Sequence, residues 1–328
     1  MGAAANPPPE RFLHQSIYFI SAVVFVVVPL FLPAYTQSLM TKILIYAIFA
    51  MSLDLIYGYA GLPSLGHAAY FGFGAYSVGV LMVKFDITSF WIAAPVTLLL
   101  SGLAAAVLGI VALRVSGIYF LLVTFALGQL LFSVAWKWDW LSSYGVEGLA
   151  GLSKPDFGVP SFSLDSTGFY YFVLLIAAIC LVAMRRLITS PFGLALQGIR
   201  ERELRMRVLG YNTWACKYTA FVIAGMFAGV AGMLFAYHRG IVLASYFDIK
   251  YSALAFLMVI IGGTGTLFGA IVGAVVISLL EYYASLITPD RWPLVLGAVF
   301  VLAGMYARAG LGVIAFRLWE RALLRWKP

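Results

Sequence analysis

The stretch Ile20–Leu32 reads Ile-Ser-Ala-Val-Val-Phe-Val-Val-Val-Pro-Leu-Phe-Leu. A strand of a membrane β-barrel would alternate apolar and polar residues, whereas an unbroken apolar run is typical of a membrane-spanning helix. Similar runs recur along the chain, which has 328 residues, of which 63% are hydrophobic and only 10% charged. About a quarter of the residues of a soluble domain are charged. The sequence therefore predicts an all-α, polytopic membrane protein and excludes a soluble globule.

About ten apolar segments are present. They fall near residues 16–34, 39–57, 67–83, 90–113, 117–137, 169–187, 215–238, 247–262, 267–286 and 292–307. An even number of spans places both chain ends on the same side of the membrane. Lys and Arg accumulate in cytoplasmic loops, and cytoplasmic termini leave fourteen of the 21 basic residues inside and seven outside. We therefore expect a retained first span and two cytoplasmic termini.

The apolar pattern divides the chain into three parts. A cytoplasmic tail at 1–15 precedes a transmembrane domain at 16–311, and a basic tail follows at 312–328. An outer loop at 139–168 is rich in Gly, Ser and Pro. In the basic tail, arginines repeat every fourth residue, which favours a helix on anionic membrane lipid. A helix that packs on the protein is the alternative.

The sequence offers no chemistry of its own. Gly61-Leu-Pro-Ser-Leu-Gly66 has the spacing of a phosphate loop, but His67 and Ala68 follow where Lys and Ser or Thr would be required. Cys180 and Cys216 have no CxxC partner and no nearby His, so they predict no metal site. Neither a Ser/His/Asp set nor paired carboxylates are evident. We therefore expect that the chain is not an enzyme and that it binds no cofactor.

Two glycine-rich segments, near 58–66 and 262–266, predict broken or short helices. Interrupted helices form substrate sites in transporters, because non-helical backbone at membrane depth is tolerated where it lines a cavity. Close helix packing is the alternative. Gly225 and Gly229, like Gly265, Gly269 and Gly273, repeat every fourth residue, and for these we favour packing.

The candidate substrate-path residues surround the first break: Asp54, Ser64, Gly66, His67 and Tyr70. A charge inside a span is costly and often functional, and for Asp54 a structural hydrogen bond is the alternative. His67 is either a hydrogen-bonded structural residue or a proton relay. Glu281, a second carboxylate inside a span, lies near an outer end, where snorkelling to the interface explains it.

The cytoplasmic loop at 188–213 predicts a short amphipathic helix. Ser190 and Pro191 form a good N-cap and first turn, and Gly210 is a natural C-terminal cap. Such a helix suits the groove of a soluble partner, which would supply the ATP hydrolysis that this chain lacks. An idle helix on the lipid surface is the alternative. The candidate contact residues are Ser190, Pro191, Gly193, Ile199, Arg200, Glu201, Glu203, Leu204 and Gly210.

Several segments together resemble the branched-chain amino-acid ABC transporter permeases of the LivM type. They are Leu53–Gly58, Gly61–Tyr76, Arg114–Phe120, Gly145–Leu152, Ser190–Gly210 and Ile261–Gly269. The resemblance implies a bacterial inner-membrane subunit that pairs with a second related permease. It also implies two cytoplasmic ATPases that contact residues 190–210, and an extracytoplasmic solute-binding protein, for which Glu147 in the outer loop is a docking candidate.

This resemblance makes the expected function that of a permease subunit of an ATP-driven importer for branched-chain or hydrophobic amino acids, or a similar small organic solute. Asp54 stands where the family commonly has Asn, and Leu62 where it has Gln. These departures leave open amides, urea, and aromatic or other carboxylic acids as substrates. Whether the pore is a homodimer or a heterodimer of permeases is open too. The alternative function is an ion-coupled secondary transporter, with Asp54, His67 or Glu281 as the ion site.

Overall fold

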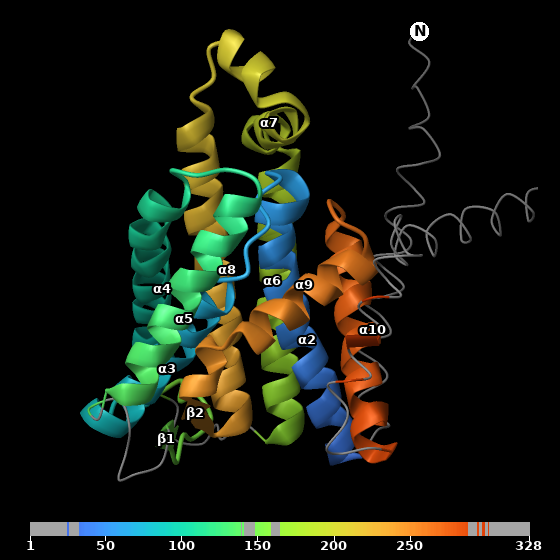
Figure 1. Cartoon of the computed structure of the whole chain (residues 1–328). Helices are drawn as coiled ribbons and strands as arrows, with labels where there is room; N and C mark the ends of the chain where they lie inside the picture. Colours follow the sequence, from blue (N-terminus) through green and yellow to red (C-terminus); the bar gives the residue numbers. More distant parts are fainter. Residues whose placement is uncertain are drawn as a thin grey trace, which may run out of the picture.

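The computed structural model describes residues 33–138, 140, 148–158 and 165–287, with single residues at 25, 294, 297, 298 and 301. These residues form a helical bundle (Figure 1). The helices are α2 (Ala34–Asp54) with its π-helical continuation η2 (Leu55–Tyr59), α3 (Ala68–Phe85), α4 (Phe90–Ala112), α5 (Ile118–Lys137), α6 (Ser166–Thr189), α7 (Pro191–Val208), α8 (Thr213–Arg239), α9 (Ile249–Gly262) and α10 (Leu267–Ile287). Two strands, β1 (Gly148–Ala150) and β2 (Ile241–Leu243), and a 3₁₀ helix, η3 (Ala244–Phe247), join them.

Seven of the described helices are long and apolar enough to cross a membrane: α2 with η2, α3, α4, α5, α6, α8 and α10. The 14 residues of α9 extend about 21 Å at 1.5 Å per residue, which is less than the roughly 30 Å of a bilayer core. The segments predicted at 16–34 and 292–307 lie almost wholly outside the described residues. The polytopic helical class is confirmed, while the count of ten spans stays a prediction.

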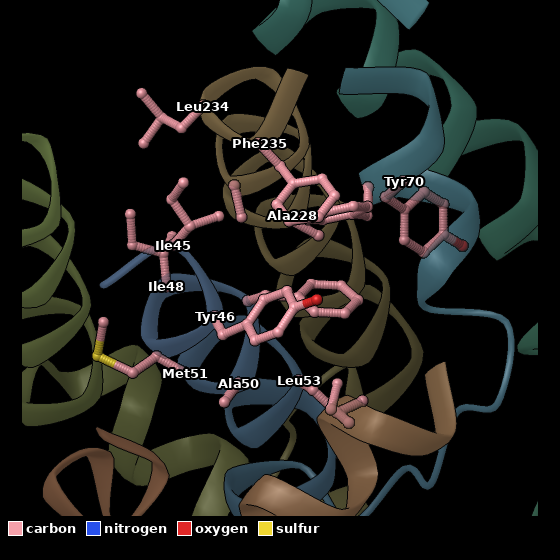
Figure 2. Packing of buried hydrophobic residues seen from close by; sticks show 14 of the residues in the cluster. Ile45, Tyr46, Ile48, Ala50, Met51, Leu53, Tyr70, Ala228, Leu234 and Phe235 are labelled. Atoms are coloured by element: carbon pink, nitrogen blue, oxygen red, sulfur yellow. The ribbon is translucent and has the colours of Figure 1, made fainter. Parts of the chain in front are cut away.

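Helix α2 lies at the centre of the bundle, where α6, α8, α9 and α10 pack around it. The most apolar window of its span is 83% buried, as expected for a helix that is apolar on every side. Figure 2 shows Ile45, Ile48 and Leu53 of this helix among buried side chains that include Phe235 of α8. This central position holds the end of α2, where the first predicted break begins, inside the protein.

Glycines let α8 approach its neighbours closely. A Cβ at Gly225 or Gly229 would overlap side chains of α4, and one at Gly273 of α10 would overlap the backbone of α9. Small residues at such positions allow the dense packing that drives helix association in membranes. The packing role predicted for Gly225, Gly229 and Gly273 is confirmed, whereas Gly265, for which packing was also predicted, lies in the turn between α9 and α10 with a φ of +81°.

The described helices α4, α5 and α6 are the least buried of the seven long helices. Only 28%, 22% and 33% of their most apolar windows are buried. Their exposed side chains are mainly large and apolar, among them Trp91, Leu103 and Ile179. Such side chains suit contact with lipid tails or with another membrane subunit.

The two ends of the bundle differ. Helix α7 lies across one end, and β1 and β2 lie at the other (Figure 1). The strands pair antiparallel, with Leu149 opposite Val242, and so fasten part of the outer loop to the end of α8. These strands have no signal in the sequence, because three residues are too few for a strand pattern. Glu147 and the tails at 1–15 and 312–328 lie outside the described residues.

Candidate functional site

The first predicted break begins where α2 widens into the π-helical turn η2. The amide of Leu62 donates to the carbonyl of Ile56 at 2.8 Å, and Gly61 has a φ of +72°, a conformation that glycine adopts without strain. The chain turns there and runs back through residues 60–67 to the start of α3. A non-helical segment therefore follows a central membrane helix, as the glycine pattern indicated.

Side chains of other helices satisfy this non-helical backbone. Thr124 of α5 accepts a hydrogen bond from the amide of Leu65 at 3.3 Å. Ser252 of α9 accepts one from the amide of Ala68, in the first turn of α3, at 2.8 Å. Gly66 packs so tightly on the backbone of Thr124 that a Cβ would overlap it. Backbone groups at membrane depth need such partners, and these contacts fix the path of the segment.

His67 is held by residues of α2. Its Nε2 lies 2.8 Å from the hydroxyl of Ser52, and its ring stacks on Phe49 with centroids 5.4 Å apart. The ring of Tyr70 meets it edge-on at 5.7 Å. His67 Nδ1 and the hydroxyl of Ser64 are buried and have no hydrogen-bond partner among the described residues. His67 is thus hydrogen-bonded, through Ser52 rather than through a neighbour in sequence.

Asp54 lies apart from these residues, at the turn between α9 and α10. Its side chain is fully buried, and Oδ1 accepts a hydrogen bond from the amide of Gly265 at 2.7 Å. Oδ2 has no hydrogen-bond partner among the described residues. Gly58 leaves room for this contact, because a Cβ there would overlap both the carboxylate and the Gly265 amide. The second predicted break, which forms the turn between Gly262 and Leu267, therefore supplies the hydrogen-bond partner of Asp54, four residues before the first break.

The five candidate path residues are all buried in this conformation. Ser64, Gly66, His67 and Tyr70 lie around the first break, where Tyr70 also contacts Phe221 of α8, and Asp54 is buried at the second break. Their role as a substrate path stays a prediction, which requires the bundle to open.

Helix α7 has the ends that the sequence predicted. The hydroxyl of Ser190 accepts a hydrogen bond from the amide of Gly193 at 3.4 Å, and Pro191 occupies the first turn. At the other end, Gly210 has a φ of +88°. The helix is kinked at Arg202, whose backbone is extended. The kink divides α7 into an inner part before Arg202 and an outer part after it.

The inner part of α7 is fastened to the membrane domain. Ile199 is only 3% exposed and packs inward. It is therefore covered in this conformation, whereas the sequence predicted that it would contact a soluble partner. Arg200 Nη1 donates to the carbonyl of Gly58 in η2. A pocket of about 740 Å³ lies beside this contact, and its lining includes Gln197, Arg200, Glu201 and Gly265.

The outer part of α7 is fastened through Glu203. Its carboxylate pairs with Arg207 at 2.7 Å and with Lys217 of α8 at 2.5 Å, and it accepts a hydrogen bond from the hydroxyl of Thr213 at 3.1 Å. Partial burial by itself would raise the pKa of Glu203, but the hydrogen bonds from Lys217 and Arg207 outweigh it and lower that pKa below its ordinary value. Leu204 and Val208 remain 76% and 88% exposed, so they form an apolar patch on the surface of α7.

Sequence reasoning missed an ion pair in the opposite half of the bundle. Lys42 of α2 and Glu281 of α10 lie 2.9 Å apart, and their side chains are 15% and 20% exposed. Lys42 also sits over the ring of Tyr46 at 5.3 Å. Glu281 itself indicated such a pair, because a carboxylate inside a membrane span usually has a partner. The sequence could not show which basic residue on the outer side was the partner of Glu281.

Among the described residues, no group of three or more His, Cys, Asp or Glu side chains lies close enough together to hold a metal ion. The candidate site consists of the two helix breaks and helix α7. Such an arrangement suits a change of conformation and contact with partner proteins.

The family model described as branched-chain amino acid transport system / permease component matches residues 35–304. The high-affinity branched-chain amino acid transport system permease protein LivM of Escherichia coli K12 is 29% identical over 286 residues, covering 80% of this chain and 67% of that protein. A probable LivM of Methanocaldococcus jannaschii is 27% identical over 259 residues, covering 70% of this chain and 75% of that protein.

More distant similarity extends to the autoinducer 2 import system permease protein LsrC of Yersinia enterocolitica, which is 28% identical over 170 residues, 50% of this chain and 44% of that protein. No solved structure matches the chain significantly. The matched region contains both breaks and α7. The family match and the LivM relatives identify the chain as a transport protein rather than an enzyme, and as a multi-pass protein of the inner membrane. The chain belongs to the family of permease components of branched-chain amino acid transport systems.

Proposed function

We propose that this chain is the membrane-spanning permease subunit of an ATP-driven, binding-protein-dependent importer. The observation that carries the proposal is α7, whose inner part is hydrogen-bonded to Gly58 at the first break while its outer part presents exposed Leu204 and Val208. An apolar face at the end of a membrane bundle suits a groove on a soluble protein. The family match makes an ATP-hydrolysing subunit the fitting occupant.

The proposed complex contains a second related permease, two cytoplasmic ATP-binding subunits that hydrolyse ATP, and an extracytoplasmic solute-binding protein. The chain itself binds no cofactor. The proposed substrates are branched-chain or other hydrophobic amino acids, or a similar small organic solute, as the names of the LivM relatives suggest. Solute would pass near the first break, where Ser64, Gly66, His67 and Tyr70 lie, when partner movement opens the bundle.

The proposed topology has ten membrane segments and cytoplasmic termini. It adds the predicted segments at 16–34 and 292–307 to the seven long helices and the short α9. Support comes from the alternation of the described helices between the two ends of the bundle (Figure 1). Support also comes from the arginines of α7, because arginine-rich ends of membrane proteins usually face the cytoplasm.

The test is purification of the tagged chain from its native membrane in mild detergent, followed by reconstitution of the recovered complex in vesicles. We expect two ATPase-type chains and a second permease to co-purify. We also expect uptake of radiolabelled leucine or valine that requires both ATP and the solute-binding protein. The matched control is the same complex with the phosphate-binding lysine of the ATPase replaced, which must abolish uptake. Uptake that stops with a proton uncoupler and ignores ATP would instead make the chain a secondary transporter.

A further inference from the structure

Arg200 belongs to the helix expected to meet the ATPase, yet it points back into the membrane domain. Its Nη1 donates to the carbonyl of Gly58, near the end of η2. The last carbonyls of a helix have no partner within that helix, and a positive charge at this end is favourable. Arg200 thus caps the end of the central membrane helix from a different element.

The stem of the same side chain packs on the turn that follows η2. A Cβ at Gly61 would lie 3.1 Å from Arg200 Cγ and 3.5 Å from its Cβ. Gly61 also has a φ of +72°, so glycine is favoured there for two reasons. Arg200 therefore contacts the first break at two points, the carbonyl of Gly58 and the turn at Gly61.

The second break meets Arg200 at the same place. A Cβ at Gly265 would lie 3.0 Å from Arg200 Nη1 and 3.2 Å from the Gly58 carbonyl oxygen, and Gly265 has a φ of +81°. The Gly265 amide is bound to Asp54 Oδ1 at 2.7 Å. We call the group of Asp54, Gly58, Arg200 and Gly265 the junction. It brings together the surface helix α7, the end of α2 and the turn between α9 and α10.

We propose that Arg200 is the positioning residue that transmits movement of α7 to both helix breaks. The inference rests on the proposed function. Arg200 lies two residues before the kink at Arg202, and Leu204 lies two residues after it. A partner bound at Leu204 and Val208 would pull on Arg200 through this short stretch of backbone, and the guanidinium would carry the Gly58 carbonyl and the Gly265 turn with it. Without Arg200, the partner still has its apolar face to bind, but the breaks no longer follow its motion.

Three variants of the complete complex, reconstituted in vesicles, test this role. Arg200→Met keeps an apolar stem of similar length and removes every donor. Arg200→Lys keeps the charge without the planar fork of donors. Arg186→Met is the matched control, because Arg186 is exposed near the same end of the bundle. Each complex is measured for recovery of the ATPase subunits, for ATP hydrolysis, and for solute taken up per ATP hydrolysed.

We expect Arg200→Met to retain the ATPase subunits and to hydrolyse ATP within about twofold of the unmodified complex. Solute taken up per ATP should fall by about tenfold or more, as the loss of a charged hydrogen bond predicts. Arg200→Lys should recover part of this ratio, and Arg186→Met all of it. If Arg200→Met is not recovered as a folded chain, Arg200→Lys decides, and it must lower uptake per ATP while leaving hydrolysis intact.

Two results would overturn the inference. Uptake per ATP equal to that of the unmodified complex would show that the breaks do not need Arg200. Loss of the ATPase subunits from Arg200→Met would show that Arg200 is a contact for the partner rather than a link within the chain. Failure of the proposed function is distinguishable from both, because the unmodified complex would then show no ATP-dependent uptake at all.

Discussion

Asp54 shows at the scale of one residue how a buried charge is accommodated. One carboxylate oxygen has the Gly265 amide, and the other has no partner among the described residues. A buried carboxylate is stable only when it is compensated. The hydrogen bond explains why an acceptor is needed here, but it does not require a negative charge.

Replacing Asp54 by Asn keeps the Oδ1 acceptor and removes the charge. We expect Asp54→Asn to fold and to melt in detergent at the same temperature as the unmodified chain or above it. Asp54→Leu leaves the Gly265 amide without its acceptor and should cost about 1–3 kcal/mol. The measurement is thermal unfolding in detergent, in which size-exclusion chromatography monitors the amount of folded protein that remains after heating. If Asp54→Asn were as damaging as Asp54→Leu, the charge itself would be required.

Gly66 is a second position where a single atom matters. We expect Gly66→Ala to lower the free energy of unfolding by about 1–3 kcal/mol, because the new Cβ overlaps the backbone of Thr124, which cannot move without shifting α5. The control is Gly102→Ala, whose Cβ would lie 3.1 Å from the flexible side chain of Met226. Yield and melting temperature in detergent are the measurements. Equal tolerance of the two substitutions would contradict the tight packing of the first break.

At the scale of elements, ion pairs join different helices. Lys42 and Glu281 connect α2 to α10, 239 residues apart in sequence, at the end of the bundle away from α7. Glu203 connects the outer part of α7 to Lys217 of the next helix, α8. Both carboxylates are partly buried, with side-chain exposures of 20% for Glu281 and 30% for Glu203.

Breaking the Lys42–Glu281 pair leaves a carboxylate largely buried. We expect Lys42→Met to cost about 1–2 kcal/mol, less than the loss of one partner of a fully buried pair, because both side chains retain some exposure. Exchange of the charges in Lys42→Glu with Glu281→Lys should recover part of this loss. Lys84→Met, at an exposed lysine that ends α3, is the control. A melting temperature of Lys42→Met equal to that of the control would mean that the pair adds nothing.

The Glu203 contacts predict a dependence of stability on pH. Because its pKa is lower in the folded chain than the ordinary value of 4.5, Glu203 stabilises the fold above that pH, and the contribution is lost as the pH falls through the folded-state pKa. Glu203→Gln should therefore melt below the unmodified chain at pH 7, and the gap should narrow as the pH falls below 4.5. Glu201→Gln, at an exposed residue of the same helix, is the control for replacing a glutamate of α7 by glutamine. A gap that is independent of pH would exclude the proposed pairing.

At the scale of the whole molecule, the two ends of the bundle define its orientation. The end with α7 carries a cluster of arginines, and the end with β1 and β2 carries the described part of the outer loop. By the positive-inside rule we expect the first end to lie in the cytoplasm. The proposed ten-segment topology would place the chain termini there too.

Single cysteines test this orientation in a chain whose native Cys180 and Cys216 have been replaced. We expect a membrane-impermeant maleimide to label Lys154→Cys, in the outer loop, from outside the inner membrane. Leu204→Cys, on α7, should be labelled only after the membrane is permeabilised. A green fluorescent protein fused to the C-terminus should fluoresce, as it does in the cytoplasm. Labelling in the reverse pattern would contradict the orientation, and a dark fusion would contradict the even number of spans.

The amino-acid sequence by itself determined the class of fold, the positions of most helices and the family. The length and continuity of apolar runs are local properties, and a helix in lipid satisfies its own backbone. Caps and breaks are local as well, so Ser190, Gly210 and the glycines of both breaks could be interpreted without a structure. The described helices begin and end within a few residues of the predicted apolar segments.

Only the tertiary structure decided which distant residues meet. That Gly265 binds Asp54, that Arg200 reaches Gly58 and that Lys42 pairs with Glu281 depends on how the helices pack. It also decided that Ile199 is buried and that α7 is kinked at Arg202, so the inner and outer parts of one amphipathic helix face different ways. The physical reason is that helix packing depends on many weak contacts between segments that are distant in sequence. The pattern of residues within one segment therefore does not show which other segment it will contact.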